Sequence, residues 1–166
     1  MILFLGPKER EIQEQQDQYM LNYEIPNTDD LQEKYPIINP SNYQDRTVKE
    51  ILKIILKGFD SWNQGIDAYL KWTYEVYDPE AESTYGDNKK RTMAEYRLAM
   101  RILVEKEKIR KLYFDNILIR DNWAALHYRY TSEDLSTGVK KCGDIMQFLN
   151  FEKKDNILKI VSSWAH

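Results

Sequence analysis

The chain has 166 residues, of which 42% are hydrophobic and 31% charged, enough to bury the core of one globular domain and too apolar for a disordered chain. The net charge of −3 and a pI near 5.5 argue against a nucleic-acid partner, which calls for a basic surface. The apolar run from Ile2 to Leu5 is shorter than the roughly 7–15 residues of a secretory signal or the roughly 20 of a membrane span, so we expect a cytoplasmic protein with no membrane partner.

Cysteine and aromatic residues narrow the expectation further. Cys142 is the single cysteine, which excludes an intrachain disulfide, and we interpret it as a packed or edge residue. The chain has 12 Tyr, 5 Phe and 4 Trp, side chains that suit pocket walls, subunit interfaces and an ordinary core alike. His127 and His166 lie far apart and no glycine-rich loop follows a strand, so we expect neither a metal nor a cofactor.

Residues 1–45 differ in composition from the rest and are expected to form an N-terminal extension. The stretch from Lys8 to Glu24 is polar with a thin apolar stripe, which predicts a weak helix. A loop is predicted to follow, because proline cannot donate a backbone hydrogen bond and recurs at Pro26, Pro36 and Pro40. We expect the extension to lie over the main domain, residues 46–166, or over a partner.

The main domain begins with two helical patterns. In the first, Thr47 and Glu50 have the spacing of a capping box, and apolar residues recur at helical intervals as far as Trp62, before Gly65. The second helix is predicted to be capped by Asp67 and to end at Asp78-Pro79. Its buried side is expected to carry Leu70, Tyr74 and Tyr77, with Trp72 on a flank.

The pattern then changes from helix to sheet. Ser83 to Gly86 predicts a short strand and turn, and Thr92 with Glu95 forms a second capping box before a third helix bearing Met93, Tyr96, Met100 and Leu103. Four strands are predicted to follow, from Ile109 to Arg120, Trp123 to Thr131, Lys140 to Phe151 and Ile157 to Trp164. Short connections between them, including Asp121-Asn122, predict an antiparallel meander, so the fold class is α+β with the helices on one sheet face.

These residues resemble the nuclear transport factor 2-like superfamily. The resemblance covers about residues 46–166 and rests on the helix-turn-helix Trp62-Asn-Gln-Gly-Ile-Asp-Ala-Tyr-Leu70, the strand Asn122 to Thr131 and the final Ile-Val-Ser-Ser-Trp164. The branch it resembles most is the SnoaL-like polyketide cyclase and ketosteroid isomerase group.

The resemblance implies a cone, in which a curved antiparallel sheet wraps around three helices and encloses a site for a small hydrophobic molecule. It implies that alternate residues of each strand point into the cone, and that the opposite sheet face forms a homodimer. The expected pocket residues are Trp62, Tyr74, Tyr96, Tyr128, Tyr130, Gln147, Ile160 and Trp164, with Ser162 beside the last two. The expected dimer face carries Trp123, His127, Arg129, Met146 and Phe148.

The sequence departs from the steroid-isomerase pattern at its three functional positions. Gly58 stands where the resemblance implies a tyrosine donor, Ser83 lies near the position of the carboxylate base, and Gln147 replaces a buried acid. Proton abstraction beside a carbonyl needs a base and an oxyanion donor, so this chemistry is not expected here. A shifted alignment would offer Glu80, Glu82 or Asp87 as the base.

The sequence is compatible with two functions. The first is a small-molecule pocket that only binds its ligand or carries a cofactor-independent isomerase, cyclase or dehydratase reaction. The second is a non-catalytic association module that dimerises through the outer sheet face, because large apolar residues on such a face need a cover.

Overall fold

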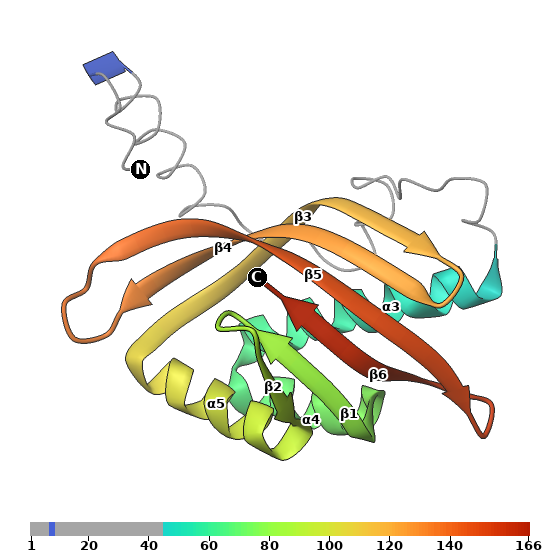
Figure 1. Cartoon of the computed structure of the whole chain (residues 1–166). Coiled ribbons are helices and arrows are strands. Elements are labelled where there is room, and N and C mark those ends of the chain that lie inside the picture. Colours follow the sequence, from blue (N-terminus) through green and yellow to red (C-terminus); the bar gives the residue numbers. More distant parts are fainter. Residues whose placement is uncertain (1–6, 9–44) are drawn as a thin grey trace.

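The computed structural model describes residues 7, 8 and 45–166, without the side chains of residues 111–116. The helix and loop predicted for the extension therefore lie outside the described residues, apart from Lys8. Three helices pack on the concave side of a strongly curved six-stranded sheet, as Figure 1 shows. The α+β cone predicted from the sequence is confirmed.

Helix α3 (Arg46–Gln64) lies along the sheet and buries one apolar face. Its cap is Asp45, whose side chain accepts hydrogen bonds from the backbone N–H groups of Thr47 and Val48, so the predicted Thr47 cap was wrong by two residues. A carboxylate in that place satisfies two amides that the helix leaves unpaired. The helix stops at Gly65, whose φ of 128° suits glycine.

Helix α4 (Ile66–Val76) is rotated relative to the prediction. It buries Tyr69, Leu70, Trp72, Thr73 and Val76, a stripe with helical spacing, whereas Tyr74 is 69% exposed and lies under the guanidinium of Arg97. The reason is Gly58 on α3, because its bare backbone leaves room for the Trp72 indole. The helix begins at Gly65 without a side-chain cap, so Asp67 does not have its predicted role.

Strand β1 (Tyr77–Tyr85) starts directly after α4, so Tyr77 is a strand residue, and the strand is longer than predicted. It forms a hairpin with β2 (Lys89–Thr92), an all-polar strand that the sequence pattern did not predict. Pro79 lies where the pairing of β1 shifts register, a position that proline tolerates. Helix α5 (Met93–Lys106) then begins with the predicted capping box of Thr92 and Glu95.

The predicted four-strand meander is confirmed, with strands one to three residues longer than expected. It consists of β3 (Glu107–Arg120), β4 (Trp123–Asp134), β5 (Lys140–Lys154) and β6 (Ile157–Ala165). The sheet order is β2-β1-β6-β5-β4-β3, and β1 joins β6 in parallel, so the sheet is mixed. This parallel pair joins the β1–β2 hairpin to the edge of the meander, as Figure 1 shows.

A β-bulge reverses the inward face of β6. Phe151 of β5 pairs with Ile160, but the preceding Asn150 pairs with Ser162, which leaves Val161 as an extra residue. An extra residue shifts the alternation by one, so Ser163 and Ala165 point inward after the bulge in place of Ser162 and Trp164. The pairing of β4 with β5 has no such break, and Ala124, Leu126 and the predicted Tyr128 are all buried on its inward face.

Candidate functional site

A cavity of about 260 Å³ lies inside the cone, between α5 and the inner faces of β1, β4, β5 and β6. Its lining is largely apolar and aromatic, with a few hydroxyl and amide groups. The lining residues are Trp62, Ser83, Tyr85, Tyr96, Met100, Leu103, Glu107, Ile109, Tyr128, Tyr130, Lys141, Ile145, Gln147, Ser163 and Ala165. We call this space the interior cavity.

Tyrosine hydroxyls supply several of the polar groups in and beside the cavity. The hydroxyl oxygens of Tyr96 and Tyr69 lie 2.8 Å apart, and Tyr96 faces the cavity while Tyr69 backs it from α4. Burial raises the pKa of both phenols, and of Tyr128, well above their ordinary range. These phenols are therefore neutral at physiological pH and can donate or accept hydrogen bonds.

A serine pair lies in the inner wall. The Ser163 hydroxyl donates to the Ser83 hydroxyl over 2.9 Å, and both side chains are buried. Burial raises the pKa of the Tyr77 phenol to about 12, and the Ser163 hydroxyl partly offsets that rise. Gln147 joins this wall from β5, so its amide and the two hydroxyls form a neutral polar patch.

The mouth of the cavity carries a charged pair that sequence reasoning missed. The Lys141 ammonium lies 3.4 Å from the carboxylate of Glu107, at the junction between α5 and β3. Among the described residues that line the cavity, Glu107 carries the sole carboxylate. The lysine-rich pattern around this junction is typical of a solvated face, and only the fold shows that Glu107 turns toward the cavity.

The alternative bases considered from the sequence lie elsewhere. Glu82 pairs with Lys90, and Asp87 forms a two-pronged ion pair with Arg91, which holds the pKa of that carboxyl well below its usual range. Glu80 is exposed, and none of the three lines the cavity.

The structure brings five of the eight predicted pocket residues to the interior cavity. They are Trp62, Tyr96, Tyr128, Tyr130 and Gln147. Tyr74 faces solvent because of the helix rotation, and Ile160 is wholly buried in the core outside the cavity lining. The inward orientation predicted for Trp164 was wrong, because the bulge at Val161 turns it to the outer face beside Phe148.

The α3–α4 contact leaves no room at position 58 for the tyrosine that the resemblance to steroid isomerases implies on the first helix. A Cβ atom at Gly58 would lie 2.6 Å from the ring of Trp72, far inside ordinary contact distance. The Trp72 indole N–H donates to the carbonyl of Ile54 over 3.2 Å, which holds the ring in place.

The outer face of the sheet carries the residues predicted for a dimer. Trp123, Met146 and Phe148 are 50%, 44% and 39% exposed, and Phe148 contacts Trp164 at 5.6 Å between ring centroids. His127 lies among them on β4, with its Nε2 atom 2.8 Å from a carboxylate oxygen of Asp144. We call this surface the outer sheet face.

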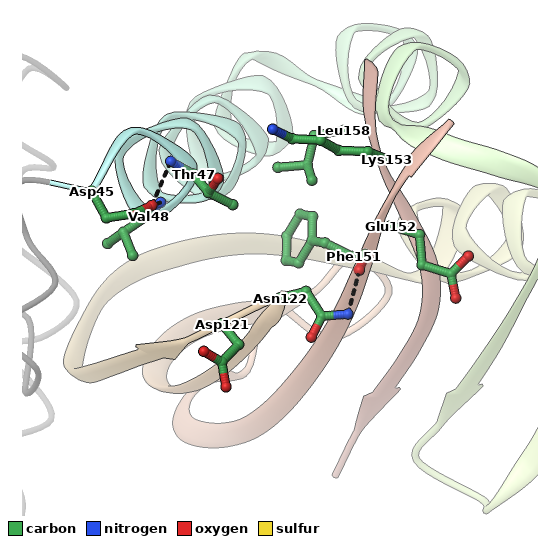
Figure 2. A pocket seen from close by; sticks show the side chains of 9 residues that line it. All are labelled: Asp45, Thr47, Val48, Asp121, Asn122, Phe151, Glu152, Lys153 and Leu158. Carbon is green, nitrogen blue, oxygen red and sulfur yellow. Dashed lines mark hydrogen bonds between the residues drawn. The ribbon is translucent and has the colours of Figure 1, made fainter. Parts of the chain in front are cut away.

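Two further hollows open on the surface. The larger one, about 750 Å³, lies between the start of α3 and the β3–β4 and β5–β6 turns, as Figure 2 shows. Its apolar floor of Val48, Phe151 and Leu158 is at most 4% exposed, so the accessible surface is mainly a charged rim. Asn122 at that rim donates to the carbonyl of Phe151 (Figure 2). An open polar basin of this kind encloses little of a small molecule.

The second hollow, of about 540 Å³, lies between the α3–α4 turn and the α5–β3 junction. We call it the outer groove. Its lining includes Trp62, Ile66, Val104, Ile109 and Leu135.

Comparison with solved structures identifies the architecture. A nuclear transport factor 2-like protein of unknown function from Burkholderia pseudomallei matches 69% of this chain and 88% of its own, with a TM-score of 0.59 and 10% identity. The protein has the nuclear transport factor 2-like fold. A ketosteroid isomerase-like protein from Erwinia carotovora atroseptica matches 73% of this chain and 95% of its own, with a TM-score of 0.57 and 10% identity.

The SnoaL-like group is also among the structural neighbours. A candidate SnoaL-like polyketide cyclase from Jannaschia matches 69% of this chain and 83% of its own, with a TM-score of 0.52 and 15% identity. At such identities the likeness concerns the fold. No family model matches the sequence, and no curated protein matches it either.

Two absences concern only the part of the chain that the structure describes. Within residues 7, 8 and 45–166, no helix combines the length and apolarity needed to cross a membrane. The same residues hold no group of three or more His, Cys, Asp and Glu side chains placed to bind a metal ion.

Proposed function

We propose that the protein binds a small, flat and mostly apolar molecule with one oxygen-bearing group in the interior cavity. The observation that carries this proposal is a cavity of about 260 Å³ lined mostly by apolar and aromatic side chains, with neutral polar groups in its wall. Binding sites for small molecules are mostly apolar with a few converging polar groups, and range from about 300 to 1,000 Å³. A cavity just below that range suits a ligand of one or two rings.

The polar groups define where the oxygen of the ligand would lie. Tyr96, Ser83, Ser163 and Gln147 come from different elements of the cone, and all are neutral. A carbonyl or hydroxyl group can exchange hydrogen bonds with such groups, whereas a charged group there would lose its hydration without a counter-charge. The Lys141 and Glu107 pair at the mouth suits a second polar group at the solvent end of the ligand.

Any reaction in this cavity would differ from steroid isomerisation. In the inner wall, Ser83 and Gln147 stand where a base and an acid would be needed. Among the described residues that line the cavity, the Glu107 carboxylate is therefore the candidate proton acceptor. If the protein is a cofactor-independent isomerase, cyclase or dehydratase, Glu107→Gln abolishes turnover and leaves ligand affinity within about threefold. If the protein only binds its ligand, neither the wild type nor Glu107→Gln converts it to a product.

Binding is tested with 2-naphthol followed by two-dimensional NMR of the labelled protein. At roughly −0.5 kcal/mol per atom for about 11 non-hydrogen atoms, we expect a Kd on the order of 0.1 mM. Ile145→Trp fills the cavity and should abolish the shifts, whereas Met146→Trp adds the same ring on the opposite sheet face and should leave them intact. Equal binding by both variants, or none by the wild type, would contradict the proposal.

The second candidate function is homodimerisation through the outer sheet face, as a non-catalytic association module or together with ligand binding. The supporting observation is the row of exposed Trp123, Met146 and Phe148, which monomeric proteins seldom leave uncovered. Sedimentation at micromolar concentration should give a dimer, and Phe148→Glu should give a folded monomer with a native circular dichroism spectrum. A monomeric wild type would exclude this function.

We also propose that the protein is cytoplasmic, because a single cysteine is typical of a reducing compartment.

A further inference from the structure

The Trp62 side chain lines both the interior cavity and the outer groove. Trp62, Ile109 and Glu107 line the interior cavity and also line the outer groove. Ile145 and Gln147 line the cavity alone, whereas Leu135 and Ile66 line the groove alone. The three shared residues therefore form the wall that separates a smaller inner space from a larger outer one.

Trp62 is held in that wall from three directions. It extends from the last turn of α3, and its indole N–H donates to the carbonyl of Ile109 on β3 over 2.8 Å. The ring of Tyr69 on α4 meets it edge to face, with centroids 4.7 Å apart. Trp62 is only 6% exposed, so the wall is a fixed part of the core and does not depend on a mobile surface side chain.

We propose that Trp62 determines ligand specificity by limiting the length of the molecule that the interior cavity accepts. This inference rests on the proposed function, because it concerns the ligand of the same cavity. With the indole present, a ring with a short substituent fits, and a longer chain meets the wall. Without the indole, the chain can pass between α3 and β3 and lie in the apolar outer groove against Leu135.

The shape of Trp62 and Ile109 suggests two independent ways to open the wall. Trp62→Ala removes the indole from the α3 side, and Ile109→Ala shortens the wall from the β3 side while the carbonyl at position 109 still accepts its hydrogen bond. Trp62→Phe keeps a ring in the wall and loses only the indole N–H and the second ring. Trp123→Ala is the matched control, because it deletes an indole from the outer sheet face.

The test compares the affinities of 4-ethylphenol and 4-hexylphenol by calorimetry for all five proteins. In the wild type, Trp62→Phe and Trp123→Ala we expect the shorter phenol to bind at least as tightly as the longer one. In Trp62→Ala, the ratio of affinities should shift at least tenfold toward 4-hexylphenol, and in Ile109→Ala in the same direction. Intermolecular NOEs from the hexyl chain to the Leu135 methyl groups should appear only in these two variants.

The outcomes separate this inference from the function beneath it. If 4-ethylphenol binds the wild type and neither opened variant changes its preference, Trp62 does not limit ligand length and the proposed function stands. If no protein of the set binds either phenol while all retain native spectra, both proposals fail. If Trp62→Ala does not fold, Ile109→Ala alone decides, because a preference unchanged in that variant overturns the inference.

Discussion

Replacing Gly58 by alanine tests how tightly the α3–α4 contact is packed. The new Cβ would lie 2.6 Å from Cζ2 of Trp72 and 2.9 Å from Cε2 and Cη2. Such overpacking costs about 1–3 kcal/mol, while the helix propensity of alanine returns about 1 kcal/mol relative to glycine. We therefore expect Gly58→Ala to lower the free energy of unfolding by about 1 kcal/mol.

The indole has little freedom to move away. Its N–H is bonded to the carbonyl of Ile54, the ring of Tyr69 stacks on it at 5.4 Å, and Tyr77 meets it edge to face at 5.9 Å. In a Trp72→Phe background the outer part of this ring is absent. There, Gly58→Ala should raise stability by up to about 1 kcal/mol, so the sign of its effect reverses.

Urea unfolding of the four proteins of this double-mutant cycle measures the effect, with the midpoint expected to shift at constant slope. A coupling free energy of about 2 kcal/mol between positions 58 and 72 is expected. The reasoning is refuted if Gly58→Ala stabilises the wild type, or if the two substitutions are additive within about 0.5 kcal/mol. That result would also mean that the helix could hold a larger side chain at the position where steroid isomerases have tyrosine.

Three further predictions concern a cap, a cavity wall and the buried phenols. Asp45→Ala should cost about 1 kcal/mol of unfolding free energy and Thr47→Ala less than about 0.5, and equal urea midpoints would contradict the cap at Asp45. Gly143→Ala should displace the Tyr130 ring, which lies 2.7 Å from the point that the alanine Cβ would occupy. The ring resonances of Tyr130 should then shift in NMR spectra, and unchanged resonances would contradict this close packing. Because burial raises the pKa of Tyr77 to about 12, its contribution to stability is complete below pH ~10 and is lost as the pH rises from there toward 12. Urea midpoints measured against pH should therefore fall less steeply for Tyr77→Phe than for the wild type, and identical slopes would argue against a buried phenol.

Much of the fold could be predicted from the sequence because its signals are local. The capping box of Thr92 and Glu95 and the turn at Asp121-Asn122 each arise within four residues of chain. Alternation along β4 predicted the burial of Tyr128, since the pairing of this strand with β5 has no break in register.

The incorrect expectations come from contacts between distant segments. Tyr74 and Trp72 both fit a helical stripe, and Gly58 on another helix decides which of them is buried. Trp164 fits an inward strand position until the extra residue at Val161, visible only in the pairing with β5, reverses the alternation.

By itself the sequence determined the order of the elements apart from β2, most of their boundaries and the presence of an aromatic interior, because propensity, capping and periodicity act between near neighbours. Only the tertiary structure decided which groups share the interior cavity. Glu107 and Lys141 are 34 residues apart in the sequence. They meet because only β4 lies between β3 and β5 in the sheet, which brings the start of β5 close to the α5–β3 junction. Trp62 separates two spaces because three elements fix its ring, and the distances between elements are set by packing, which a linear pattern does not contain.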